Sequence, residues 1–170
     1  VRRSIPHMRN FPHEHIIILS GDQLYMMDYR VMLEHHRSLG AEITIAVTPV
    51  RAEEAPGFGI LKTDAHHRIT EFYEKPKLDD LAGKETPASP EMEAAGRIYL
   101  ASMGIYIFNT HALQEELDAN PSDHDFGKQI IPDMYPRMKV HAYDFAKNYI
   151  PGEEGHNRGY WRDVGTVGSY

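Results

Sequence analysis

His15-Ile16-Ile17-Ile18-Leu19-Ser20-Gly21-Asp22 is the stretch that decides the fold. Its apolar start is rich in β-branched side chains and ends at a small turn, which is typical of a strand buried on both faces of a parallel sheet. Ligands of open α/β sheets bind beyond the carboxyl ends of the strands. We therefore expect Asp22 at the edge of a binding site.

The next residues complete a βαβ unit. Asp28 can cap a helix over residues 28–39, where apolar residues recur at helical spacing until Gly40 ends it. Residues 43–48 (ITIAVT) form a second strand by the same criteria as the first. A strand, a helix and a strand in this order predict a parallel pairing of the two strands.

The rest of the chain mixes strand and helix patterns. A polar turn at residues 64–67 separates two strand-like runs, 60–63 and 68–73, which predicts a hairpin. The other expected elements are a surface excursion (77–97), a strand (104–108), a helix capped by Thr110, a helix capped by Asp125, a strand (140–145) and a glycine-bearing loop (152–159). Together these predict an α/β fold with a mostly parallel sheet and a hairpin extension.

Composition narrows the class of protein. The 170 residues, 41% of them hydrophobic, suit one globular domain or a large part of one. The formal charge of -7 argues against nucleic acid as a partner, yet carboxylates can hold a divalent cation that carries small phosphorylated ligands. The absence of cysteine excludes disulfides and thiolate metal sites, and no apolar run suits a membrane span or signal peptide. A cytoplasmic location is expected, with no membrane partner.

Both ends of the chain favour a piece of a longer protein. Val1 is not an initiator methionine, and residues 167–170 carry no terminating feature. A processed or tagged protein is the alternative interpretation.

Two aspartates are candidate metal ligands. Asp22 follows the first strand, and Asp163 lies in the Tyr160-Trp161-Arg162-Asp163 stretch near the other end of the chain. Carboxylates from two separate strands could hold one Mg²⁺ ion, which prefers few carboxylates together with phosphate oxygens. An ordinary turn at Gly21-Asp22, and an ion pair with Arg162 or a helix cap before Thr166, are the structural alternatives.

Glu74-Lys75-Pro76 ends the predicted hairpin. The carboxylate could accept hydrogen bonds from sugar hydroxyls, and the cation could bind a phosphate. Proline favours an extended exit, which would direct the two charged side chains to opposite sides. A solvated charge pair is the alternative.

Other catalytic patterns find no support. The 11 histidines show no metal-ligand spacing, so a structural zinc site is not expected. The sequence contains no Gly-x-Ser-x-Gly, Gly-x-Gly-x-x-Gly or phosphate-cradling Gly-x-x-x-x-Gly-Lys-Ser/Thr motif.

Several short elements, each weak alone, occur in a fixed order that spans essentially the whole chain. They are 19–29 (LSGDQLYMMDY), 58–59 (FG), 71–76 (EFYEKP), 101–108 (ASMGIYIF), 125–132 (DFGKQIIP) and 160–166 (YWRDVGT). This ordered set resembles the bacterial glucose-1-phosphate adenylyltransferases. The Glu-Lys-Pro element is shared by nucleotidyltransferases for several sugars, whereas SMGIY, DFGK and YWRDVGT are more particular to the adenylyl enzymes.

The resemblance implies a Rossmann-like (GT-A-like) nucleotidyltransferase domain that is incomplete at both ends. Residues 1–170 would be its central part, without the N-terminal glycine-rich nucleotide loop and the C-terminal β-helix domain. The implied reaction transfers AMP from ATP to α-D-glucose 1-phosphate, giving ADP-glucose and pyrophosphate with Mg²⁺ in glycogen or starch synthesis. The implied parent is a cytoplasmic allosteric homotetramer, and the isolated chain would be inactive and expose part of its sheet.

The resemblance also implies roles for individual residues. Asp22 and Asp163 would be the catalytic, metal-binding pair. The residues implied to bind glucose 1-phosphate are Gly59, Glu74, Lys75 and Ser102, with Lys75 on the phosphate.

Three alternatives remain open. The parent could use UTP, dTTP or GTP instead of ATP. It could be a non-catalytic regulatory subunit, although such a subunit has no chemical need for both aspartates and the Glu-Lys pair. A free-standing sugar-phosphate binding module would require the chain to be complete.

Overall fold

The computed structural model describes residues 4–8, 12–86, 89–152 and 159–165. Its strands are β1 (His15–Leu19), β2 (Gln23–Tyr25), β3 (Ile43–Val50), β4 (Gly59–Thr63), β5 (Ile69–Glu74), β6 (Tyr99–Asn109), β7 (Val140–Asp144) and β8 (Trp161–Asp163). Its helices are α1 (Ile5–Met8), α2 (Tyr29–Ser38), α3 (Pro90–Ala94), α4 (Thr110–Ala119) and α5 (Ile131–Met134). Short helical turns are η2 (Ala55–Gly57), η3 (Leu78–Asp80), η4 (Phe126–Ile130) and η5 (Phe145–Lys147). No helix in these ranges is long and apolar enough to cross a membrane.

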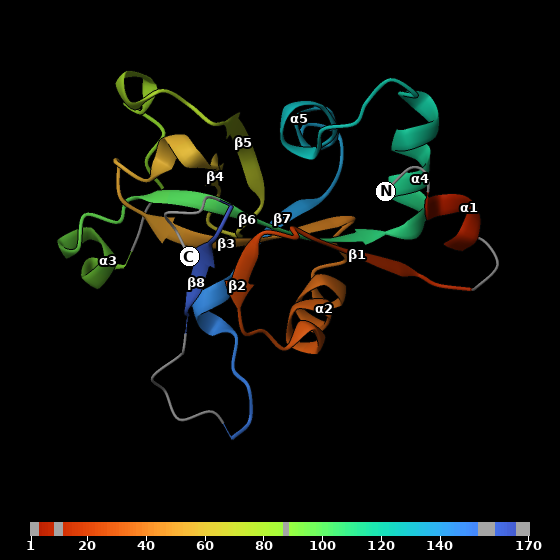
Figure 1. The fold of residues 1–170 in the computed structure, drawn as a ribbon, viewed down its shortest axis with the longest axis horizontal. Coiled ribbons are helices and arrows are strands. Elements are labelled where there is room, and N and C mark those ends of the chain that lie inside the picture. The colour runs from red at the N-terminus through yellow and green to blue at the C-terminus, as the bar shows by residue number, and fades with distance from the viewer. Residues whose placement is uncertain (1–3, 9–11, 87–88, 153–158, 166–170) are drawn as a thin grey trace.

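Two sheets organise the fold (Figure 1). The six-stranded main sheet has the order β5-β4-β6-β3-β7, with β1 also paired to β6, and β2 and β8 form a separate antiparallel ribbon. β6 is antiparallel to β1, β3 and β4, β5 is antiparallel to β4, and β7 is parallel to β3. Four of the six strands, β1, β3, β4 and β7, therefore run in one direction. The predicted α/β class and the predicted hairpin are confirmed.

The predicted direct pairing of residues 15–19 with residues 43–48 is wrong. β1 and β3 run parallel, but β6 lies between them and bonds to both. The sequence pattern showed only residues 104–108 of this strand, whereas β6 has 11 residues and reaches back to Tyr99. Local periodicity identifies strands but does not identify the neighbour that each strand will have.

β1 is also less buried than its sequence indicated. Ile16 is 7% exposed, but Ile17 is 39% and Leu19 is 45% exposed. Among the described strands β1 is bonded to β6 alone, so it lies at an edge of the sheet. The prediction that this strand is buried on both faces is wrong for the residues that the structure describes.

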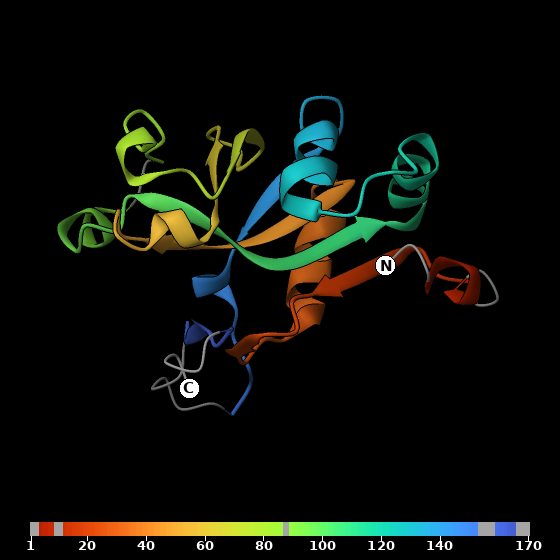
Figure 2. The ribbon, with the colours of Figure 1, turned by 45° about the horizontal axis from the view of Figure 1, so that its top comes forward.

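Elements on both faces of the main sheet build the core (Figure 2). On one face, α4 and α5 pack against a cluster that includes Phe108, Leu113 and Met134. On the other face, α2 and the β2–β8 ribbon cover a second cluster that includes Met32 and Phe145. The β2–β8 ribbon and the main sheet are thus two separate sheets, called the two bodies of the fold below. Side-chain packing and a few hydrogen bonds join them.

Two of the three predicted helix caps are present. Asp28 accepts a hydrogen bond from the Arg30 backbone N–H at 3.0 Å, and Asp125 accepts one from the Lys128 backbone N–H at 2.9 Å. Thr110 was expected to cap α4, but it is the first helical residue and Asn109 holds the cap position. Asn109 ends β6 with an extended backbone, which suits the residue before a helix.

The excursion at residues 77–97 carries only η3 and α3 in its described part. The predicted loop at residues 152–159 lies mostly outside the described residues. Thr166 and the two chain ends lie outside them as well.

Candidate active site

The candidate site opens at a gap along one side of β6. β1 ends opposite Ile105, and the pairing of β4 with β6 begins with Ile60 opposite Ala101. β3 occupies the other side of β6 along both stretches. The segment from Ser102 to Gly104 therefore pairs with none of the described strands on the side where β1 stops and β4 starts.

β6 bulges at this gap. Opposite the β3 residues Ile45 and Val47, the pairing jumps from Tyr106 to Ser102, so β6 carries extra residues here. Gly104 has a φ of 70°, a left-handed conformation that costs glycine little. Its carbonyl oxygen accepts a 3.0 Å hydrogen bond from the Ser20 backbone N–H, which fixes the start of the loop that carries Asp22.

A cavity of about 200 Å³ lies at the gap. All six site residues predicted from the sequence line it: Asp22, Gly59, Glu74, Lys75, Ser102 and Asp163. They come from β4, the end of β5 and the residue after it, β6, β8 and the loop after β1. The fold brings the predicted site residues together, while the role of each one stays a prediction.

The carboxylates of Asp22 and Asp163 converge on one point. The β2–β8 pairing places Gln23 opposite Asp163, and the Val164 N–H donates to the Asp22 backbone oxygen at 2.9 Å. A Cβ atom built on Gly165 would lie 3.0 Å from Asp163 Oδ1 and 3.2 Å from Asp22 Oδ2. One carboxylate oxygen from the loop before β2 and one from β8 thus face the same small space.

This pair fits a Mg²⁺ ion. Mg²⁺ is commonly held by one or two carboxylates plus phosphate oxygens and water rather than by an all-protein cage. Within the described ranges no group of three or more His, Asp or Glu side chains could hold a metal. A cation at Asp22 and Asp163 would therefore take its other ligands from substrate phosphates and water.

Glu74 is held in a narrow space. A Cβ atom on Gly59 would lie 3.0 Å from Glu74 Oε2, and a Cβ atom on Gly127 would overlap the same carboxylate. Burial, and then the nearby Asp125 carboxylate, raise the pKa of Glu74, while Lys75 and Lys128 act in the opposite direction. The two glycines let backbone approach the carboxylate and leave it half-buried beside the cavity.

Lys75 has a backbone conformation that the sequence did not suggest. Its φ of 46° is rare for a residue other than glycine, and it precedes Pro76. A 3.1 Å hydrogen bond from its backbone N–H to the Phe58 oxygen holds this geometry. The predicted extended exit, with Glu74 and Lys75 on opposite sides, is wrong, because both residues line the same cavity.

Sequence reasoning missed other residues of the cavity wall. Gln23, Phe58, Tyr106 and Gly127 line it as well. Tyr106 presents its hydroxyl oxygen 3.4 Å from Ser102 Oγ, and the Phe58 ring packs on the ring of Trp161 at a centroid distance of 5.1 Å. Each of these residues stands inside one of the motifs that carried the resemblance, so that pattern could have found them.

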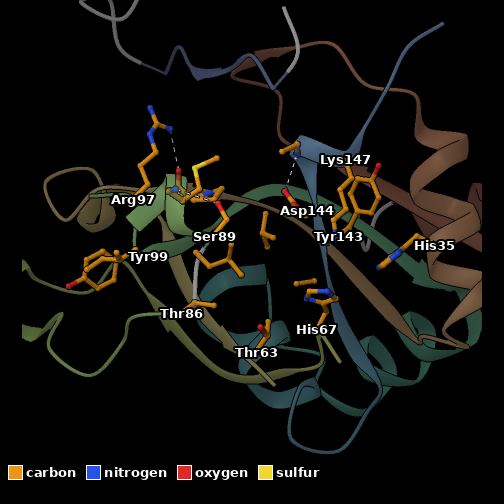
Figure 3. A pocket seen from close by; sticks show the side chains of 17 residues that line it. His35, Thr63, His67, Thr86, Ser89, Arg97, Tyr99, Tyr143, Asp144 and Lys147 are labelled. Atoms are coloured by element: carbon orange, nitrogen blue, oxygen red, sulfur yellow. Dashed lines mark hydrogen bonds between the residues drawn. The ribbon is translucent and has the colours of Figure 1, made fainter. Parts of the chain in front are cut away.

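A roomier cavity lies elsewhere. About 380 Å³ in volume, it is mostly apolar, and residues at its wall include Thr63 and His67 of the hairpin, His35 of α2, and Tyr143 and Asp144 of β7 (Figure 3). It shares no lining residue with the candidate site. Volume alone therefore does not mark the place where the predicted residues meet.

The chain is similar to known proteins along almost its whole length. It is 45% identical over 161 residues to a glucose-1-phosphate adenylyltransferase of an Anaeromyxobacter species, covering 92% of this chain and 37% of that relative. It is 45% identical over 168 residues to the Thermus thermophilus enzyme of the same name (96% and 38%), and 40% over 174 residues to that of Dechloromonas aromatica (100% and 37%). The resemblance stated from the motifs is confirmed, and the chain spans a little over a third of the length of these relatives. Residues 4–170 match the family model described as nucleotidyl transferase, and the chain belongs to this family.

Proposed function

We propose that the protein containing this chain is a glucose-1-phosphate adenylyltransferase, which transfers AMP from ATP to α-D-glucose 1-phosphate and releases pyrophosphate. Residues 1–170 are then the central part of its catalytic domain. The observation that carries the proposal is the meeting of Asp22, Asp163 and the Glu74-Lys75 pair in one cavity. The names of the similar proteins support the choice of sugar and nucleotide.

The proposed reaction depends on the positioning of the two substrates and on neutralisation of the phosphate charge. It needs no covalent intermediate with the protein. The sugar phosphate attacks the α-phosphorus of ATP, and pyrophosphate leaves. Asp22 and Asp163 hold Mg²⁺, which neutralises charge on the reacting phosphates when bound. Lys75 binds the phosphate of glucose 1-phosphate, and Glu74 accepts hydrogen bonds from the sugar hydroxyls. Ser102 and the backbone at Gly59 complete the sugar-phosphate side of the site.

The size of the cavity suggests that it binds only part of the two substrates. Its volume of about 200 Å³ is small beside the roughly 300–1,000 Å³ of sites that bury a whole drug-sized ligand. We assign this cavity to glucose 1-phosphate and the reacting phosphates, and the base of ATP to other parts of the parent protein. The proposal includes a cytoplasmic parent that works as a homotetramer under metabolite control in glycogen or starch synthesis.

The test is pyrophosphate release by the full-length protein from glucose 1-phosphate with ATP, UTP, dTTP or GTP, in Mg²⁺. We expect release with ATP, and a loss of about a hundredfold or more in Asp22→Asn, because one of the two metal-binding carboxylates is gone. Asp118→Asn removes an exposed carboxylate on α4, away from the site, and should keep the wild-type rate.

Two other outcomes of the pyrophosphate assay would change the proposal. Release with a different nucleotide would keep the reaction type and replace ATP as the substrate. No release with any nucleotide would refute catalysis and favour the regulatory-subunit alternative.

A further inference from the structure

The candidate site is divided between two bodies of the fold. Asp163 belongs to the ribbon of β2 and β8, and Asp22 directly precedes β2. Glu74 and Lys75 lie at the end of β5, and Ser102 lies in β6, so these three belong to the main sheet. The distance from the carboxylate pair to the Glu74-Lys75 pair therefore depends on how the ribbon sits on the main sheet.

Each body fixes its own part of the site. In the ribbon, β2 pairs with β8, and the Val164 N–H bonds the Asp22 oxygen, so the two aspartates move together. In the main sheet, Gly59 pairs with Glu74 across β4 and β5. These contacts lie within each body, and the bond from the Ser20 N–H to the Gly104 oxygen joins the two.

The ribbon is held to the main sheet at both of its ends. At the Asp22 end the anchor is the bond from the Ser20 N–H to the Gly104 oxygen. Aromatic packing continues along it, with the rings of Tyr25 and Phe145 6.5 Å apart at their centroids. At the far end, where the chain leaves β2 for α2, the polar contact is made by Asn148.

Asn148 is buried, with 6% of its surface exposed. Its Oδ1 accepts the Asp28 backbone N–H at 2.8 Å, and its Nδ2 donates to the Asp28 backbone oxygen at 3.0 Å. The same Nδ2 donates to the hydroxyl of Tyr143, in β7, at 2.9 Å. The amide thus bonds both backbone groups of Asp28 as a neighbouring strand would, and ties them to the main sheet.

We propose that Asn148 is a positioning residue that holds the ribbon carrying Asp22 and Asp163 in register with the main-sheet half of the site. It does not line the site cavity, so it acts through the position of the ribbon. Its catalytic consequence rests on the proposed function, whereas its structural consequence does not.

Two substitutions distinguish the bonds from Asn148 to Asp28 from its bond to Tyr143. Asn148→Asp keeps the size of the side chain but removes both N–H donors, and its carboxylate would face the Asp28 carbonyl oxygen. Tyr143→Phe removes only the hydroxyl and leaves both bonds to Asp28. The first variant should therefore release the ribbon, and the second should have a much smaller effect.

Hydrogen exchange of the full-length protein tests the structural half. In Asn148→Asp we expect amides of residues 23–28 and 161–165 to exchange about tenfold faster, because the local opening of the ribbon becomes easier. Amides in β3 and β6 should keep the wild-type rate, and they report whether the variant is folded. Equal acceleration of both sets, or no acceleration of the ribbon, would overturn the proposal. If Asn148→Asp does not fold, Asn148→Ser, which keeps one donor, is judged by the same comparison.

Steady-state kinetics test the catalytic half. We expect kcat for pyrophosphate release in Asn148→Asp to fall about tenfold or more, since small misplacements of reacting groups are costly. The KM for glucose 1-phosphate and the Mg²⁺ concentration for half-maximal rate should change less than about threefold, because each body keeps its own geometry. A change in either constant at unchanged kcat would contradict the role assigned to Asn148. Lack of activity in the wild type would refute the proposed function, and the exchange experiment would still decide the structural role.

Discussion

At the scale of the residue, the charge on Glu74 lowers the stability of the fold although the proposed function needs it. Burial and the Asp125 carboxylate raise its pKa, so the folded protein disfavours the ionised form. Above the ordinary glutamate pKa the unfolded chain ionises more readily than the folded one. The charge on Glu74 therefore lowers stability at neutral pH, as expected for a group placed to meet a ligand.

Glu74→Gln should stabilise the protein and weaken sugar-phosphate binding. We expect the thermal midpoint at pH 7 to rise by about 1–3 °C, because glutamine cannot carry the unfavourable charge. The gain should shrink as the pH falls through the range where Glu74 becomes protonated. The KM for glucose 1-phosphate should increase about tenfold or more, because glutamine replaces one of the two acceptor oxygens with an N–H donor.

Glu71 on the same strand is the matched control. The hydroxyl of Tyr73 and the ammonium of Lys62 lower its pKa, so its charge is favoured in the fold. Glu71→Gln should lower the thermal midpoint at pH 7. The same direction of change in both variants, measured by differential scanning calorimetry, would contradict the assignment for Glu74.

At the scale of the element, an ion pair with a buried carboxylate joins α4 to the segment after α5. The side chain of Glu116 is fully buried, contacts Arg137 Nη2, and accepts from Asn120 Nδ2 at 2.9 Å. Arg137 also bonds Asp133 at 2.8 Å and is itself 42% exposed. Burial raises the pKa of Glu116, so the cation is needed to keep this carboxylate ionised inside the fold.

Arg137→Met should lower the free energy of unfolding by about 2–3 kcal/mol, because Glu116 would be left buried without its cation. Adding Glu116→Gln should recover more than half of this loss. Arg30→Met removes an 86% exposed arginine from its pair with Asp28 and should cost much less stability than Arg137→Met. Urea denaturation measures all three, and equal losses for the buried and exposed pairs would refute this account.

The elements also differ in how far sequence predicted them. The helix after Asp28 and the hairpin at residues 60–73 were predicted because cap, period and turn are local signals. The strand that pairs with β1 was not predicted. Two strands far apart in sequence carry no local pattern that identifies them as partners. The bulge at Gly104 escaped prediction for the same reason, because it exists only relative to the pairing with β3.

At the scale of the whole molecule, buried and partly buried histidines make stability depend on pH. Burial lowers the pKa of His15, His35, His36 and His141. His36 bonds Asn109 Oδ1 through Nε2 at 3.0 Å, and Asn109 is oriented by its own bond from Nδ2 to the Ala41 oxygen. Nε2 is therefore the donor, and Nδ1 accepts from the Thr44 hydroxyl at 2.7 Å in the neutral ring.

Stability should fall as the pH decreases from 7 to 5. The folded pKa values lie below the unfolded one, so the unfolded chain binds protons first below about pH 6.5. His36→Gln should reduce the slope of unfolding free energy against pH by up to about 1.4 kcal/mol per pH unit, the value for one proton. Urea denaturation across this pH range checks both, and equal slopes for wild type and His36→Gln would refute the role of His36.

The sequence by itself determined the α/β class, the hairpin, the helix after Asp28 and the motif residues that the fold later brought together. These follow from short-range chemistry, namely side-chain periodicity, caps, turns and ordered motifs. Only the tertiary structure decided that β1 and β4 stop and start along one side of β6, that Lys75 turns into the cavity beside Glu74, and that Asn148 bonds to Asp28. The physical reason is that these features are contacts between segments far apart in the chain, and their free energies exist only after the segments have packed.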